Sequence, residues 1–280
     1  MLTTTTPTII RIGGVDLHVA PPAGEGDPLV IVHGSWTDHT AFDAGAGPLA
    51  RSFRLVRYDR RGHSRSEYSG PAPRRRDEDD LAELIEALEI GPAHLLATSY
   101  GALIALGLAV RRPELVRSVL AHEPPMLGLV PDPQVEAQLA SVQAQLAVGD
   151  HAGGTRRFFE ELVLGPGSWE RLPEPLRRAA VGNAQTFVDL RDDPDWATLD
   201  LAALARLDRP ILVTAGTTSP QWLGHVPIAV ADGAGIPTRR IEGAGHSPHL
   251  THPAALVAAV EAFARPAGAE PAPVRPARRA

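Results

Sequence analysis

Short runs of branched apolar residues, bounded by Gly, Pro or Asp, recur along the chain. They occupy 29–32, 55–58, 94–97, 116–121 and 211–213. Continuously apolar runs of this length are typical of strands in a parallel sheet that is covered on both faces. Two further runs, 9–12 and 15–19, are separated by a Gly-Gly pair and predict an opening β-hairpin.

Helical periodicity fills the spaces between these runs. Leu81, Leu84, Ile85 and Leu88 recur at the spacing of one apolar helix face. Residues 101–110 are almost all apolar and predict a buried helix. Strands that alternate with helices in this way predict an α/β fold with a mostly parallel sheet and helices on both faces.

The alternation stops between about residues 126 and 207, where only helical patterns occur. Because an apolar strand resumes at 211, we interpret this region as a helical insertion over the carboxyl edge of the sheet, where open α/β sheets bind ligands, rather than as a separate domain. The predicted organisation is a core formed by 1–125 and 208–265, a helical cap at 126–207, and a Pro-, Ala- and Arg-rich tail at 266–280 that is expected to be disordered.

Composition excludes several classes of chemistry. The chain has no cysteine, and each of its 27 basic residues is arginine. Disulfides, thiolate zinc sites, iron–sulfur clusters and cysteine nucleophiles are therefore excluded, as are Schiff-base lysines and phosphate-loop lysines. A net charge of -6 argues against a nucleic-acid partner.

The sequence gives no sign of a membrane or secretory segment. Its longest apolar stretch, near 102–110, is shorter than the roughly 18 residues of a bilayer-spanning helix. Residues 1–11 lack the basic start and apolar stretch of a secretory signal. We therefore expect a cytoplasmic protein that acts on a small molecule without a cofactor, and neither on nucleic acid nor at a membrane. Its oligomeric state does not follow from the sequence.

The first candidate for chemistry is Ser99, in the segment Ala97-Thr98-Ser99-Tyr100-Gly101. It follows a predicted strand and opens a predicted helix, which is the context of a nucleophile on a sharp strand-to-helix turn. Small residues on both sides allow such a turn to pack tightly, although Ala97 stands where the usual G-x-S-x-G pattern has glycine. A serine that merely caps a helix is the alternative.

Two loops that follow predicted strands add further polar groups. One reads His33-Gly34-Ser35-Trp36, and the backbone N–H groups of Ser35 and Tyr100 are candidates for stabilising an oxyanion. Taken alone, this loop also fits a plain strand-end turn. The other loop begins with Asp59 and Arg60, which we expect to hold the loop rather than to touch a substrate.

His246 lies in a Gly-rich segment between a predicted short strand and a predicted helix. A neutral imidazole on such a loop can take the proton of a distant serine and return it to a leaving group. A loop histidine without a role is one alternative. A metal site formed with His249 and His252 is another, which we disfavour because two prolines interrupt the helix that would bring the three side chains together. We therefore predict no metal site.

Taken in their order along the chain, the four motifs resemble those of the α/β-hydrolase superfamily, and in particular its capped, serine esterase-like branch. They correspond to an H-G-x oxyanion loop, a D-x-R-G-x-G-x-S-type loop, a nucleophile elbow and a G-x-G-H loop, and the resemblance covers about residues 9–125 and 208–265. It implies an eight-stranded, mostly parallel sheet with a helical cap. It also implies that Ser99 is the nucleophile and His246 the general base of a catalytic triad, with oxyanion N–H groups from Ser35 and Tyr100.

The third triad residue departs from the family pattern. The acid usually follows the strand that corresponds to 210–215, but residues 216–220 contain no carboxylate. Glu123 directly follows the strand predicted at 116–121, and some family members, including a group of haloalkane dehalogenases, have the acid after that strand. We predict Glu123 as the acid. A structural glutamate at the cap hinge is the alternative for it, and Asp232 is a less favoured candidate acid.

The residue types favour ester chemistry among the activities of this fold. Ser99 stands where epoxide hydrolases and dehalogenases have aspartate, and Tyr100 stands where serine perhydrolases tend to have methionine. The expected reaction is carboxylesterase-like: cleavage of a carboxylic ester, lactone or thioester through an acyl-enzyme. Trp36 and Met126 are expected to form an apolar wall for a small to medium apolar substrate. A C–C bond hydrolase, a lyase or biosynthetic cyclase, and an inactive ligand-binding protein are the alternatives.

Overall fold

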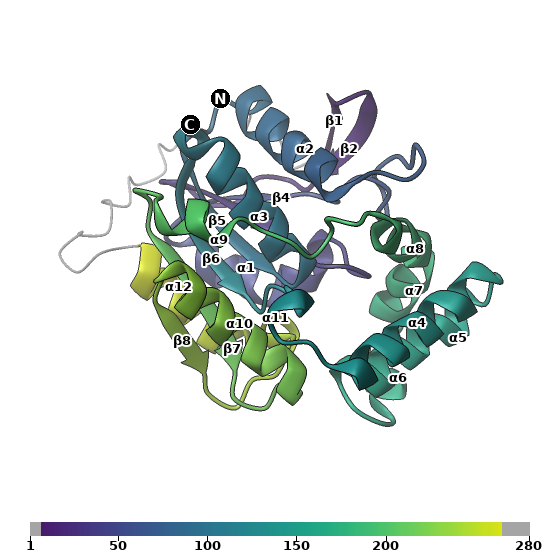
Figure 1. The fold of residues 1–280 in the computed structure, drawn as a ribbon. Helices are drawn as coiled ribbons and strands as arrows, with labels where there is room; N and C mark the ends of the chain where they lie inside the picture. The colour runs from purple at the N-terminus through teal and green to yellow at the C-terminus, as the bar shows by residue number, and fades with distance from the viewer. Residues whose placement is uncertain (1–6, 265–280) are drawn as a thin grey trace.

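The computed structural model describes residues 7–264, which fold around a six-stranded sheet whose neighbouring strands are all parallel (Figure 1). The strand order across the sheet is β4-β3-β5-β6-β7-β8. These strands are β3 (Pro28–Val32), β4 (Arg54–Arg57), β5 (Ala93–Thr98), β6 (Val116–His122), β7 (Ile211–Gly216) and β8 (Thr238–Ile241). The mostly parallel sheet that the apolar runs predict is therefore confirmed.

The first two strands form a sheet of their own. β1 (Thr8–Ile12) and β2 (Val15–Val19) pair as an antiparallel hairpin. The hairpin and the segment after it reach the region of β4 only through isolated bridges, because β4 has four residues and offers little edge for a longer ladder. The strands of residues 7–264 are thus divided into sheets of six and two, and the single eight-stranded sheet that the resemblance implies is not formed.

Successive residues of each parallel strand face opposite sides of the sheet, and both sides are apolar. Leu95 in β5 faces a core that includes α2 (Arg74–Ala87), α3 (Tyr100–Arg111) and α10 (Gln221–Ala234). Leu96 faces a second core that includes α1 (Asp43–Ala50) and α12 (Pro253–Ala264). Burial on both faces explains why these strands are continuously apolar in sequence.

Every element between β6 and β7 is helical. The elements are η3 (Leu127–Leu129), α4 (Pro133–Ala147), α5 (His151–Arg157), the π-helical η4 (Phe158–Val163), α6 (Ser168–Arg171), α7 (Glu174–Gly182), α8 (Ala184–Asp192) and α9 (Leu201–Ala205). In Figure 1, α4 to α8 lie to one side of the sheet, and α9 returns to pack on α10. α7 ends at Gly182 and α8 begins at Ala184, so Asn183 separates the two helices. The segment lies in the range for which we predict a cap, whereas the tail predicted at 266–280 lies outside the described residues.

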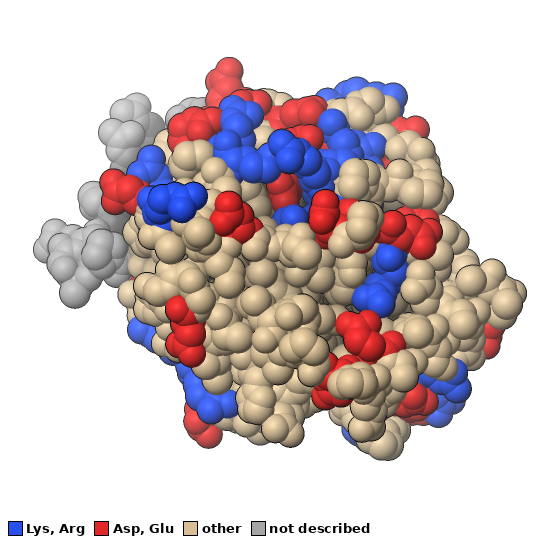
Figure 2. All heavy atoms as spheres, in the orientation of Figure 1, with Lys and Arg blue, Asp and Glu red and all other residues tan. Residues whose placement is uncertain are grey.

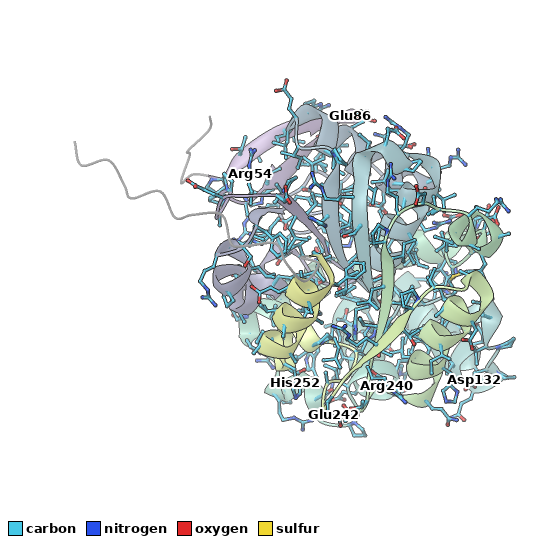
Figure 3. All side chains as sticks on the ribbon, turned by 90° about the vertical axis from the view of Figure 1, so that its left-hand side faces the viewer. Arg54, Glu86, Asp132, Arg240, Glu242 and His252 are labelled. Carbon is cyan, nitrogen blue, oxygen red and sulfur yellow. The ribbon has the colours of Figure 1, made fainter. Side chains whose placement is uncertain are left out.

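Parallel pairing gathers the carboxyl ends of the strands at one edge of the sheet. Figure 3 shows Arg54, which begins β4, and Glu242, which follows β8, at opposite ends of the molecule. Asp132, the N-cap of α4, lies toward the same end as Glu242. The helical segment, which follows β6, therefore leaves the sheet from its carboxyl edge.

Charged side chains gather over α2, at the top of Figure 2, while much of the rest of that face is uncharged. Arg74 and Arg111 both contact Glu78, at 2.6 and 2.8 Å. Glu78 is buried, so these pairs join α2 to α3 through a carboxylate that is shielded from water. Although the surface has this uncharged region, none of the helices in residues 7–264 is both long and apolar enough to cross a lipid bilayer.

Candidate active site

Ser99 stands at a sharp turn between β5 and α3. Its backbone has φ 53° and ψ -128°, a conformation that strains a residue other than glycine. The turn is held by the N–H of Ser99, which donates to the carbonyl of His122, the last residue of β6, at 2.8 Å. No residue of 7–264 hydrogen-bonds the Ser99 hydroxyl, which is therefore free to react.

Small neighbours make this turn possible. A Cβ atom on Gly101 would lie 2.4 Å from the carbonyl oxygen of Val32, and one on Gly34 would lie 3.0 Å from the Cβ of Ser99. Ala97, which replaces the usual glycine, is fully buried in β5. The backbones of α3 and of the loop after β3 therefore close on the serine from two sides.

Glu123 lies at a second turn with positive φ, directly after β6, where φ is 47°. Its side chain is buried, and its Oε2 accepts a hydrogen bond from Nδ1 of His246 at 2.6 Å. Burial alone would raise the pKa of this carboxyl, but the hydrogen bond from His246 and the attraction to its imidazole hold the pKa below the ordinary value. Glu123 is thus an ionised partner of the histidine.

The loop after β7, where the resemblance implies an acid, instead donates to Glu123. Oε1 of Glu123 accepts the backbone N–H of Gly216 at 2.8 Å and the hydroxyl of Ser219 at 2.5 Å. Because β7 pairs with β6, this loop and Glu123 meet at adjacent strand ends. The other candidate acid, Asp232, is exposed on α10. The structure therefore brings Glu123, and not Asp232, to His246.

His246 lies on the loop between β8 and α11 (Pro248–Thr251). Since the carboxylate of Glu123 accepts from Nδ1, Nδ1 carries a proton, and Nε2 lies on the other side of the ring. The ring centroid lies 6.3 Å from that of His122, whose carbonyl holds the Ser99 N–H. The described chain has no hydrogen bond between Nε2 and Ser99; such bonds commonly tighten only when substrate binds.

The three evenly spaced histidines do not converge. The ring of His249 stacks on Phe42 with 4.6 Å between ring centroids, whereas His246 bonds Glu123. His252 ends α11, and Figure 3 shows it beside Glu242. Within residues 7–264, these three positions do not form a metal-binding group.

Arg60 fixes the loop that carries Ser35. Its Nε donates to the carbonyl of His33 at 3.1 Å, and its Nη2 donates to the carbonyl of Gly34, also at 3.1 Å. The Gly34 carbonyl and the Ser35 N–H belong to one planar trans peptide and point in opposite directions. Holding the carbonyl therefore aims the Ser35 N–H away from the arginine. The N–H of Tyr100, the first residue of α3, has no acceptor inside the helix.

The guanidinium of Arg60 is itself enclosed. It contacts Asp77 at 3.1 Å and lies over the ring of Tyr100, 5.1 Å from the ring centroid. A cavity of about 30 Å³ lies beside these groups and is also lined by Ser35. That volume fits about one water molecule and no substrate. Arg60 therefore holds the loop through its two carbonyls, as expected, and the absence of a substrate contact stays a prediction.

Trp36 and Met126, the expected apolar wall, are both buried. The ring of Trp36 is 2% exposed and packs on Phe187 and Phe158, with ring centroids 4.7 and 4.9 Å apart. Met126 is 4% exposed. Trp36 therefore joins the loop after β3 to the helical segment through aromatic contacts, and a wall of Trp36 and Met126 against a substrate stays a prediction.

Two further residues support the site without belonging to a sequence motif. The side-chain amide of Asn183 donates to the carbonyls of Trp36 and Thr37 at 3.2 and 3.1 Å, which ties α8 to the loop after β3. Ser219 bonds Glu123 across 96 residues of chain. A polar residue inside an apolar helical pattern is the one local signal for Asn183, and nothing local marks Ser219.

Known proteins are similar to this chain in sequence and in fold. A model of the alpha/beta hydrolase family matches residues 29–260. The uncharacterized hydrolase YraK of Bacillus subtilis (strain 168) is 36% identical over 199 residues, which cover 70% of this chain and 71% of that protein. The (E)-2-((N-methylformamido)methylene)succinate hydrolase of Acinetobacter baylyi is 26% identical over 245 residues, 86% of this chain and 91% of that protein. The crystal structure of a hydrolase from Pseudomonas aeruginosa has a TM-score of 0.76 at 27% identity and covers 93% of this chain and 98% of its own.

Three buried histidines around the site make stability depend on pH. Burial lowers the pKa of His122 to about 4, and that of His33 and His249 to about 3, from 6.5. Below pH 6.5 the unfolded chain binds protons that the folded chain does not, so stability is full above that pH and falls as pH drops toward 4. Each histidine contributes a slope of up to about 1.4 kcal/mol per pH unit.

Urea unfolding followed across this range tests the prediction. We expect the slope of unfolding free energy against pH to flatten in His249→Phe, which keeps the stacking on Phe42 and removes one titrating group. Replacing the exposed His225 by Gln is the control and leaves the slope unchanged. A wild-type protein whose unfolding free energy stays constant over the interval contradicts the prediction.

Proposed function

This chain belongs to the alpha/beta hydrolase family, and on that premise we propose that it is a serine hydrolase that cleaves an ester-type bond through an acyl-enzyme. The observation that carries the proposal is the 2.6 Å hydrogen bond from Nδ1 of His246 to Glu123, together with the strained turn of Ser99, whose N–H is held by the carbonyl of the residue before Glu123. The substrate class is a carboxylic ester, lactone or thioester with a small to medium apolar acyl group.

Acylation starts at Ser99. Its hydroxyl oxygen attacks the carbonyl carbon while Nε2 of His246 takes the hydroxyl proton. Ionised Glu123 stabilises the imidazolium that forms, because it already accepts from Nδ1 in the resting protein. His246 then returns the proton to the leaving alcohol or thiol. A water molecule, deprotonated by the same imidazole, hydrolyses the acyl-enzyme and restores Ser99.

The developing oxyanion is bound by the backbone N–H groups of Ser35 and Tyr100. One such donor is worth about 3–4 kcal/mol of transition-state stabilisation when it is held in place before the reaction. Arg60 holds the Ser35 N–H in place, because it binds the carbonyls of His33 and Gly34. The Tyr100 N–H is held in place because Tyr100 is the first residue of α3.

A carboxylated substrate is the second candidate, since one relative is named for a succinate derivative. Binding such a substrate requires a cation that is free to pair with it. Arg60 and Arg61 line the small cavity that Ser35 also lines, but Arg60 pairs with Asp77 and Arg61 with Asp80. The aromatic contacts around Trp36 are apolar. These features favour a neutral acyl ester.

Serine-directed labelling and a substrate series test the proposed function together. We expect a fluorophosphonate probe to label the wild type and not Ser99→Ala. Among p-nitrophenyl esters of increasing acyl length, tested beside lactones and a succinate monoester, short and medium neutral esters should turn over fastest. Ser99→Ala should reduce kcat by at least about 10⁴-fold. An unlabelled wild type contradicts the proposal, and preference for the succinate monoester supports the second candidate instead.

Substitution of Glu123 tests the position of the acid. In Glu123→Gln the side-chain size is kept but the negative charge is lost, so the imidazolium loses its counter-charge and the histidine its tautomer. We expect kcat to fall by about 10⁴-fold, measured with the best ester. The control is Asp232→Asn on the exposed side of α10, which should retain wild-type activity. Equal activity of Glu123→Gln and wild type would remove Glu123 from the mechanism.

Substitution of Arg60 tests the support of the oxyanion loop. Arg60→Lys keeps a positive charge opposite Asp77 but replaces the planar fork, in which Nε and Nη2 each hold one loop carbonyl, by a single nitrogen. We expect kcat to fall by up to about 10²-fold with a much smaller change in KM. Arg61→Lys is the control, because Arg61 pairs with Asp80 and contacts neither carbonyl. A loss that appears in KM alone, or equally in both variants, argues against this role.

A further inference from the structure

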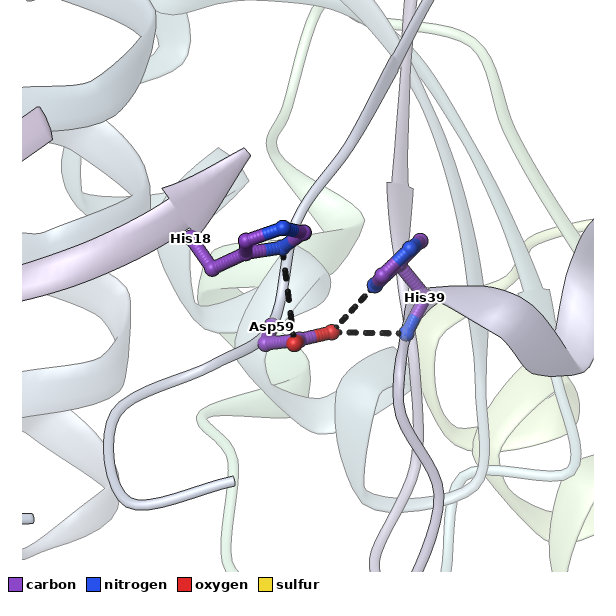
Figure 4. A group of neighbouring side chains, drawn as sticks. All are labelled: His18, His39 and Asp59. Atoms are coloured by element: carbon purple, nitrogen blue, oxygen red, sulfur yellow. Dashed lines mark hydrogen bonds and ion pairs between the residues drawn. The ribbon is translucent and has the colours of Figure 1, made fainter. Parts of the chain in front are cut away.

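Two histidines and an aspartate from three chain segments converge outside the candidate active site. Figure 4 shows His18 from β2, His39 from the start of η1 (His39–Phe42), and Asp59 from the loop after β4. Nδ1 of His18 lies 3.6 Å from Oδ2 of Asp59, and Nδ1 of His39 lies 2.5 Å from Oδ1. The three ligand-type atoms all lie within 4.8 Å of one another.

The backbone holds this group together. The N–H of Asp59 donates to the carbonyl of His18 at 2.9 Å. The Asp59 carboxylate in turn accepts the backbone N–H of His39 at 3.0 Å and that of Arg65 at 3.2 Å, so both of its oxygens are oriented. The exposed fractions of the side chains are 9% for His18, 10% for His39 and 0% for Asp59. The cluster is therefore ordered and mostly shielded from water.

Nδ1 of His18 is the feature that these contacts leave unexplained. The atom is buried and has no hydrogen-bond partner. A buried polar atom without a partner is destabilising, and in folded proteins it usually marks a bound water or ion. His18 also packs on His39, with 5.0 Å between ring centroids, which directs both imidazoles to the same carboxylate.

We propose that His18, His39 and Asp59 form a binding site for a divalent transition-metal ion of the Zn²⁺ type. Two imidazole nitrogens and one carboxylate oxygen are donors that such ions prefer, with water completing the coordination. Bonds of about 2.0–2.2 Å in tetrahedral geometry place ligand atoms about 3.3 Å apart. The pair at 3.6 Å has nearly that separation, and the pair at 2.5 Å needs to open by less than about 1 Å.

Charges around the cluster are compatible with a cation. Asp59 contributes one negative charge to the cluster, and it pairs with both histidines. Asp38 attracts a positive charge on His18, as Asp59 does. The nearest cation is Arg65, whose Nη1 lies 3.8 Å from Oδ2 of Asp59; its side chain is 54% exposed and can turn into solvent. Coordination through Nδ1 of His39 requires the ring proton to sit on Nε2, so that Nδ1 offers its lone pair to the ion.

The bound ion would join three segments around the loop of Ser35. β2 belongs to the separate hairpin, His39 follows that loop, and Asp59 directly precedes Arg60. The ion touches neither Ser99 nor His246, so its effect is on the stability of this region rather than on the reaction. The site would thus add a connection through an ion to the backbone hydrogen bonds that already join the hairpin to the segment around Asp59.

Zinc titration of the full chain, freed of metals and of any histidine tag, tests the site. We expect one equivalent of Zn²⁺ to bind to the wild type and raise Tm, and each of His18→Gln and His39→Gln to weaken binding by at least about 10-fold. The matched control is His94→Gln, which alters another buried histidine, one that contacts Ser118. It should lose stability without losing zinc affinity.

A measurement on the wild type alone covers the case in which a variant fails to fold. Histidine-selective nitrogen NMR should show two Nδ1 signals shifting when Zn²⁺ is added, and Co²⁺ should give the visible absorption of a low-coordinate site. The proposal is overturned if the wild type binds no zinc, if no pair of Nδ1 signals shifts, or if both cluster variants bind zinc as tightly as His94→Gln. A shift of the His246 signals instead also overturns it, because it assigns the ion to the active site.

Discussion

The parallel register of β5, β6 and β7 determines where the reactive groups meet. Thr98 pairs with His122, and His122 pairs with Thr214, so the residues after these strands emerge side by side. Ser99 and Glu123 then turn with positive φ, which directs both side chains away from the path of their strands. A shift of β6 by one residue would turn its side chains to the opposite face and part the carboxylate from the imidazole. The register of the buried strands therefore determines how the polar residues at the carboxyl edge of the sheet are placed.

The carboxylate of Glu123 and the lack of a carboxylate in the loop after β7 have the same physical cause, which is that a buried carboxylate needs hydrogen-bond donors around it. Glu123 is buried, and an ion in that position needs donors on both oxygens. His246 serves one oxygen, and Gly216 and Ser219 serve the other. An acid placed on the loop of Ser219 would put a second negative charge at the same spot, and one of the two carboxyls would have to take up a proton. Moving the acid to β6 thus requires the loop after β7 to become a donor.

Features with local causes were predictable from the sequence, and features formed by distant contacts were not. A strand buried on both faces needs consecutive apolar residues, so the parallel strands were visible as apolar runs. The end of such a strand also marked Glu123. The separate hairpin and the donors on Glu123 depend on partners far along the chain and leave no periodicity. The same is true of His18, His39 and Asp59, which have no motif spacing and meet only because the hairpin folds back on β4.

Asp59 and Arg60 show how one short segment orders two groups at once. Adjacent residues of an extended chain point in opposite directions. Asp59 accordingly reaches His39, while Arg60 reaches the carbonyls of His33 and Gly34. The loop between His33 and His39 is thereby fixed at both ends by neighbours on the loop after β4. Because these contacts exist before any substrate arrives, the peptide of Ser35 would not have to be ordered during the proposed reaction, and such prior order makes a backbone N–H an effective oxyanion donor.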